Sequence, residues 1–160
     1  MYKAPSAPKE QKSLIKKAQQ AIISESSEEL DSLSKESCSG IRCLVARNFN
    51  TPAKTLMLLL KDLRPDVRIS ISLNPNLNTN ITDLLMTDPE SRVRVALAKN
   101  ELISEDTLAQ LAGDIDEVVR ITVAENESTN LETLKILAKD KSKFVREAVN
   151  ENSTYFYSKK

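Results

Sequence analysis

The sequence of 160 residues contains no histidine and no tryptophan, and it has only two glycines and two cysteines. Without histidine, the common zinc-ligand sets and the Ser-His or Cys-His nucleophilic pairs lack their imidazole. So few glycines also exclude a Gly-rich phosphate-binding loop. We therefore expect no metal, no cofactor and no catalytic residue. The cysteines, Cys38 and Cys43, are expected to be reduced thiols of a cytoplasmic protein rather than a redox pair.

Neither sign of charge is in surplus, because 23 lysine and arginine residues balance 23 aspartate and glutamate residues. Nucleic-acid-binding proteins usually carry a basic surplus, so this balance argues against nucleic acid as the main partner, although a local basic patch is compatible with it. No apolar run approaches the roughly 20 residues of a membrane span, and we expect no membrane partner. Residues 1–10 are polar and lack the apolar core of a signal peptide, which predicts a disordered N-terminal lead-in.

One eight-residue phrase recurs five times: an aliphatic residue, an arginine, two variable positions, an aliphatic residue, a small residue, one free position and an asparagine. The copy from Val67 to Asn74 reads Val-Arg-Ile-Ser-Ile-Ser-Leu-Asn. Every step between copies is 26 residues, which places the arginines at Arg42, Arg68, Arg94, Arg120 and Arg146. Self-similarity at a fixed period of this length is typical of a stacked array of identical supersecondary units.

Each unit of 26 residues reads as two helices. The first helix carries paired leucines: Leu30 and Leu33, Leu56 and Leu59, Leu84 and Leu85, Leu108 and Leu111, and Leu134 and Leu137. Good N-cap residues precede it in four units, namely Ser26, Asn78, Ser104 and Asn130, and the other unit has Thr51 followed by Pro52 at the expected first helical position. Ser26 and Glu29 have the spacing of a capping box.

The second helix of each unit follows an acidic residue and carries the recurring phrase. These acids, interpreted as N-caps, are Glu36, Asp62, Asp88, Asp114 and Asp140. The helix ends at the recurring asparagine, a residue that tolerates the left-handed conformation of helix ends and can satisfy free carbonyl groups. We interpret each asparagine as a turn device and not as a binding site.

This pattern resembles HEAT-like repeats, and most closely the leucine-rich repeat variant (LRV) type, from Ser26 to about Asn152. The resemblance implies an all-α fold, a right-handed α-solenoid of about five repeats, and a scaffold that binds protein or, less often, nucleic acid. Residues 11–25 have apolar side chains at helical spacing and do not match the repeat, so we predict an N-terminal capping helix. Residues 26–152 are then the repeat array, and residues 153–160 are a C-terminal tail that caps the last unit or contacts a partner.

The arginine column invites two interpretations. Arg68 lies about 100° from Val67 around the helix, on the flank that faces the neighbouring unit. We predict that the arginines form an inter-repeat ladder with Asp62, Asp88, Asp114 and Asp140, because a guanidinium group suits a carboxylate and exposed carbonyl groups. The alternative is a row of contacts to phosphate groups.

Function in such an array is expected where the fold does not dictate the residue. Ile69 lies about 200° from Val67, away from the core, and the same column contains Cys43, Val95, Ile121 and Glu147. Second helices line the concave side of such arrays. With neighbouring outward positions, the predicted partner-binding residues are Ile69, Leu73, Val95, Lys99, Val118, Ile121 and Phe144. Two alternatives are that these side chains pack against one another, or that the assumed helix phase is wrong by one position.

The sequence bears on three classes of function: an enzyme, a nucleic-acid-binding module and a protein-binding scaffold. No charged groups converge as an active site requires, so we expect no enzyme. A nucleic-acid-binding module that uses the arginine columns is the alternative function, but the repeats lack aromatic residues on which bases could stack. The favoured prediction is a scaffold or adaptor that binds a partner protein or a second copy of itself. A Val95→Asp change is then expected to abolish association without unfolding, whereas unfolding would favour internal packing.

Overall fold

The structure is a computed structural model that describes residues 8–158, so most of the expected lead-in over residues 1–10 lies outside the described residues. Within the described range all regular structure is helical, and the predicted all-α architecture of helix pairs is confirmed. The chain divides into two compact units, Met1–Asn76 and Leu77–Lys160. No described helix has the length and apolar character needed to cross a membrane. Cys38 and Cys43 are free thiols.

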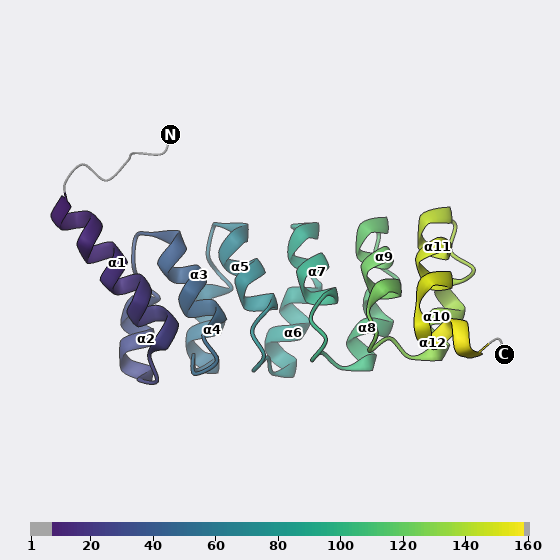
Figure 1. Ribbon diagram of the computed structural model, residues 1–160, viewed down its shortest axis with the longest axis horizontal. Helices are drawn as coiled ribbons and strands as arrows, with labels where there is room; N and C mark the ends of the chain where they lie inside the picture. Colours follow the sequence, from purple (N-terminus) through teal and green to yellow (C-terminus); the bar gives the residue numbers. More distant parts are fainter. Residues whose placement is uncertain (1–7, 159–160) are drawn as a thin grey trace. The chain divides into compact units, whose positions relative to one another are not determined.

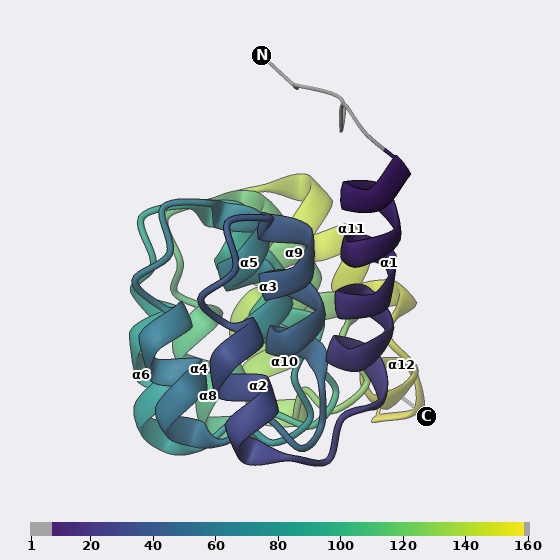
Figure 2. The same ribbon diagram turned by 90° about the vertical axis from the view of Figure 1, so that its left-hand side faces the viewer.

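The first unit contains two helix pairs preceded by one longer helix. In chain order its helices are α1 (Pro8–Ile23), α2 (Ser27–Leu33), α3 (Ser39–Arg47), α4 (Ala53–Leu59) and α5 (Pro65–Ser72). The second helices of the two repeats, α3 and α5, pack side by side, and α1 packs on the other side of α3 (Figure 2). Helix α1 begins at Pro8, earlier than the expected residue 11, because proline is well suited to the first helical turn.

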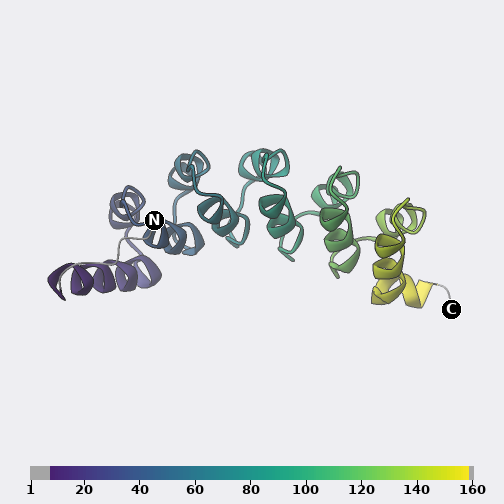
Figure 3. The ribbon, with the colours of Figure 1, turned by 90° about the horizontal axis from the view of Figure 1, so that it is seen from above.

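The second unit contains three helix pairs and a short final helix (Figure 1). These are α6 (Thr79–Met86), α7 (Ser91–Ala98), α8 (Glu105–Leu111), α9 (Glu117–Glu125), α10 (Leu131–Leu137), α11 (Lys143–Glu151) and α12 (Ser153–Ser158). Within this unit the first helices α6, α8 and α10 form one layer, and the second helices α7, α9 and α11 form the other (Figure 3). The expected C-terminal tail thus forms α12, which packs against α10 and α11.

The core of each repeat comes from the recurring apolar positions of both helices. In the second repeat, Leu56, Val67 and Ile71 are completely buried. The third repeat departs from the predicted leucine pair, because Leu84 is 49% exposed while Ile81 is completely buried. The reason is a shift on α6: Thr82 stands at the register that leucine holds in the other repeats, and the preceding isoleucine fills the core.

Four predicted N-caps of the first helices are confirmed. The side chains of Ser26, Asn78, Ser104 and Asn130 each accept a hydrogen bond from the backbone N–H three residues ahead. Two details were predicted wrongly. The N-cap of α4 is Pro52 and not Thr51, whose buried hydroxyl donates to the Val45 carbonyl at 2.6 Å. The capping box is incomplete, because the Glu29 carboxylate accepts from Gln20 at 2.7 Å instead of returning to Ser26.

The second helices begin two residues later than predicted. Their N-caps are Cys38, Arg64, Glu90, Asp116 and Ser142, not the preceding acidic residues. The aspartates form a tight turn before the helix: Asp114 Oδ1, for example, accepts the backbone N–H of Asp116 at 2.8 Å. Asp62, Asp88 and Asp140 make the equivalent bond. This local hydrogen bond competes with the capping geometry, so the helix starts after it.

The recurring asparagines connect neighbouring repeats. Asn126 Nδ2 donates to the Ala98 carbonyl at 2.7 Å, and Asn152 Nδ2 donates to the Ala124 carbonyl at 2.9 Å. In the first unit, Asn74 donates to the Ala46 carbonyl at 2.8 Å. The predicted satisfaction of helix-end carbonyls is therefore confirmed, but the carbonyls belong to the preceding repeat. The predicted left-handed conformation is wrong, since no non-glycine residue in the described range has a positive φ.

Candidate partner-binding surface

The structure brings six of the predicted arginine and aspartate residues together as three pairs. In each pair the arginine Nε and Nη2 donate to the two carboxylate oxygens of an aspartate 20 residues ahead, in the next repeat. The Nε–Oδ2 distances are 2.6 Å for Arg42–Asp62, 2.6 Å for Arg94–Asp114 and 2.7 Å for Arg120–Asp140. All six side chains are at most 16% exposed, so each pair is a largely buried, two-bond contact.

The third arm of each arginine is held inside its own repeat. Nη1 of Arg94 donates to the Asp88 carbonyl at 2.7 Å, and Arg68 and Arg146 donate in the same way to the carbonyls of Asp62 and Asp140. Arg42 and Arg120 repeat this contact. The arginine column is therefore engaged with backbone and carboxylate oxygens of the protein itself, and these contacts do not favour a row of phosphate-binding groups.

These contacts change the ionisation of the paired groups. The hydrogen bond from Arg120 is the largest cause that lowers the pKa of Asp140. Burial alone raises the pKa of Asp114, but the hydrogen bonds from Arg94 and from the Asp116 backbone outweigh it, and the pKa lies below its usual value. The carboxylate in turn raises the pKa of Arg94. Both partners stay charged near neutral pH, where a general acid or base would need to exchange a proton.

The predicted partner-binding residues are not equally accessible. In the second unit, Val118 and Phe144 are 51% and 53% exposed, and Lys99 is exposed, whereas Val95 and Ile121 are half-buried. In the first unit, Ile69 and Leu73 are also half-buried. The second helices lie side by side, so an outward side chain in the middle of one helix is partly covered by its neighbour. The accessible apolar surface is therefore smaller than the predicted stripe.

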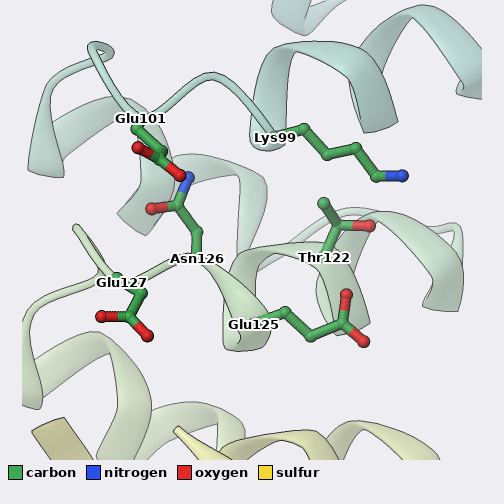
Figure 4. Close-up of a pocket in the computed structure, with 6 residues that line it drawn as sticks. All are labelled: Lys99, Glu101, Thr122, Glu125, Asn126 and Glu127. Carbon is green, nitrogen blue, oxygen red and sulfur yellow. The ribbon is translucent and has the colours of Figure 1, made fainter. Parts of the chain in front are cut away.

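A pocket of about 130 Å³ lies beside Lys99 at the C-terminal ends of α7 and α9 (Figure 4). Its lining residues are Lys99, Glu101, Thr122, Glu125, Asn126 and Glu127. Figure 4 shows Thr122 between the side chains of Lys99 and Glu125, which extend along the same side of the pocket. Small-molecule pockets usually measure about 300–1,000 Å³ and are mostly apolar, so this charged recess suits a single side chain of a partner better.

Sequence reasoning missed a second group of exposed apolar side chains. Leu63 and Ile115 are 94% and 90% exposed at the same register, in the turn between the two helices of a repeat. Ile136, on the outer side of α10, is 67% exposed. Helical periodicity says nothing about turn positions. The sequence did hold one indication that these positions are exposed. At the register of Leu63 and Ile115, the third repeat has Pro89 and the fifth has Lys141, so packing in the core does not determine the residue there.

The repeated helix pairs and their polar connections define an all-α helical-repeat protein. The sequence matches no protein-family model and no curated protein. The chain is similar to a solved structure described as a leucine-rich repeat variant with a novel repetitive protein structural motif, with 26% sequence identity and a TM-score of 0.62. The similarity covers 82% of this chain and 53% of that one, so the chain spans about half the length of that structure. The resemblance to the LRV type is thereby confirmed.

Proposed function

We propose that the chain is a non-enzymatic protein-binding module whose contact surface is the outward side of α7, α9 and α11. The observation that carries the proposal is the exposure of Val118 and Phe144, large apolar side chains at a register where the other repeats have glycine, aspartate and arginine. Val95 and Ile121, which also point away from the core, are half-buried, and Lys99 and Glu125 are exposed polar residues on the same helices. An apolar centre with a polar rim is the usual composition of a protein interface.

The alternative function, nucleic-acid binding through the arginine columns, has less support. The Nε and Nη2 groups of three arginines already donate to aspartates, in Arg42, Arg94 and Arg120. A phosphate could bind these groups only by displacing a largely buried carboxylate. The proposed surface also carries Glu125 beside Lys99, so it has no basic surplus. A partner protein, including a second copy of this chain, fits the mixed surface better.

The proposal is tested by reversing the character of the exposed apolar side chains. Val118→Asp and Phe144→Asp are expected to fold normally, because both residues are about half exposed, and to lose the partner. Val95→Asp is a poorer test, since a charge at a half-buried position disturbs folding as well as binding. The matched control is Ile136→Asp, which places the same charge at a 67% exposed aliphatic residue on α10.

Affinity capture with the intact chain as bait provides the measurement. Proteins retained by the wild type and by Ile136→Asp, but lost with both Val118→Asp and Phe144→Asp, are the expected result. Equal retention by all four baits would contradict the proposed surface. Sedimentation velocity over a range of protein concentrations reports whether the partner is a second copy. Circular dichroism melts establish that the variants remain folded.

A further inference from the structure

Arg146, in the last repeat of the second unit, is held in the same way as the arginines of the ion pairs. Its Nη1 donates to the carbonyls of Asp140 at 2.6 Å and Lys141 at 3.1 Å. Arg120 has the same two contacts, at 2.8 and 3.2 Å, to the equivalent carbonyls of its own repeat. Arg146 is also half-buried. Its guanidinium group is therefore fixed in position before any ligand arrives, which reduces the entropy lost on binding.

The opposite edge of the guanidinium group distinguishes Arg146 from Arg42, Arg94 and Arg120. In Arg42, Arg94 and Arg120 this edge, Nε and Nη2, takes both oxygens of an aspartate. Among residues 8–158, no side-chain carboxylate forms an ion pair with Arg146. Helix α12 packs against α10 and α11 and follows Asn152 at the C-terminal end of α11, whereas Arg146 lies in the first half of α11.

Three lysines lie within seven residues of Arg146 in the sequence. Lys139, Lys141 and Lys143 are all exposed, and the carbonyl of Lys141 is itself a contact of Arg146. No other repeat has more than one basic residue at the three equivalent positions; the fourth repeat, for example, has glycine, isoleucine and glutamate. Asp140, the one acidic residue among them, is already paired with Arg120. The local charge is therefore positive and attracts an acidic partner.

From these observations we propose that the basic edge formed by Arg146, Lys139, Lys141 and Lys143 binds an acidic segment of a partner protein. A carboxylate of that segment accepts hydrogen bonds from Nε and Nη2 of Arg146, as Asp140 does from Arg120. A carboxylate is favoured over a phosphate because Arg42, Arg94 and Arg120, which hold the same register, each bind a carboxylate side-on, with two coplanar oxygens. This site adjoins the proposed contact surface at Lys143, whose Nζ lies 4.9 Å from the centroid of the Phe144 ring, but it does not depend on binding at Val118.

The protein itself supplies a suitable probe. The peptide acetyl-Ala-Gly-Asp-Ile-Asp-Glu-amide copies residues 112–117, which contain the Asp114 that binds Arg94. Titration of the full chain with this peptide is followed by the ¹⁵N-correlated NMR signals of the arginine Nε–H groups. We expect saturable shifts of the Arg146 signal with weak binding, roughly millimolar. A peptide with Asn in place of Asp114 is expected to bind about tenfold more weakly, because it lacks one charge-assisted acceptor pair.

Two protein variants complete the test. Arg146→Gln is expected to weaken peptide binding at least about tenfold, and the matched change Arg47→Gln, at an exposed arginine of α3, leaves it unchanged. If Arg146→Gln lowers the melting temperature, the comparison of the Asp and Asn peptides on the wild type decides. Equal binding of the two peptides overturns the proposal. So does tighter binding of inorganic phosphate than of the peptide, or a shift of the Arg146 signal that depends only on protein concentration and therefore reports self-association.

Discussion

Removal of Arg94 tests whether the arginine and aspartate pairs hold the repeats together. The side chain donates to both oxygens of Asp114, at 2.6 and 2.9 Å, and to the Asp88 carbonyl at 2.7 Å. Arg94→Ala deletes all three hydrogen bonds. It also leaves the carboxylate of Asp114, a side chain only 7% exposed, without its cation. An uncompensated buried charge is one of the few causes of a large loss of stability from a single substitution.

The expected magnitude follows from this burial. Breaking a buried pair by removing one partner costs about 3–5 kcal/mol, and the remaining exposure of the pair places Arg94→Ala near the lower limit, at about 3 kcal/mol. For a unit of this size, 1 kcal/mol corresponds to roughly 4–8 °C, so the melting temperature of the second unit is expected to fall by roughly 12–24 °C. Most of this loss of stability then comes from the unpaired, buried carboxylate of Asp114, and not only from the missing contacts of the arginine.

Urea denaturation followed by circular dichroism measures the change, with two comparisons. The first comparison is Arg92→Ala, two residues earlier on α7. The Arg92 side chain is 63% exposed and its Nε lies 2.9 Å from a carboxylate oxygen of Glu90. Its removal should lower the free energy of unfolding by less than about 1 kcal/mol. Adding Asp114→Asn to Arg94→Ala should restore part of the stability, because the buried charge is gone. A loss for Arg94→Ala no larger than that for Arg92→Ala would refute the structural role of the pair.

Two further predictions concern the polar connections. Asn126→Ala removes a buried bond to the Ala98 carbonyl and is expected to cost about 2–3 kcal/mol in urea denaturation, whereas Asn80→Ala, at an exposed position on α6, should change stability by less than about 0.5 kcal/mol. Equal losses would contradict the proposed connection. Because its pKa is lowered in the folded state, Asp140 contributes stability that is present above its unfolded pKa of about 3.9 and is lost as the pH falls through the lower folded value. The urea midpoint should therefore fall more steeply below about pH 4 in the wild type than in Asp140→Asn, and parallel curves would contradict this.

The fold could be predicted because one number, the 26-residue period, fixes the place of every helix in the repeat. A residue that recurs at a fixed register must occupy equivalent places, so an arginine on the flank of one unit and an aspartate at the turn of the next could be expected to meet. Arg94 and Asp114 do meet. The start of the second helix could not be predicted from residue preference alone. Asp114 bonds both Arg94 and the Asp116 backbone, and this double use delays the helix by two residues.

The accessible surface was harder to predict than the fold. A helical wheel gives the direction of a side chain from its own helix, but not how much of it the next helix covers. Ile121 and Val118 both lie off the core of α9, yet Ile121 is half-buried and Val118 is 51% exposed, since Val118 lies at the end of the helix. The exposure of Leu63 and Ile115 follows from turn geometry, to which helical periodicity does not apply.

Within the second unit, α9 is fastened to both of its neighbours by polar contacts at its two ends, and these contacts point in opposite directions along the chain. Near its N-terminal end, Arg120 reaches 20 residues forward to Asp140 in the next repeat. At its C-terminal end, Asn126 reaches 28 residues back to the Ala98 carbonyl in the preceding repeat. Apolar contact between helices is not directional, so it costs little free energy to shift one repeat relative to the next. These hydrogen bonds, in contrast, form only in one register. The positions between the two ends on the outward side, such as Ile121, are free of this requirement, so a surface that recognises a partner can change there while the stacking of the repeats stays the same.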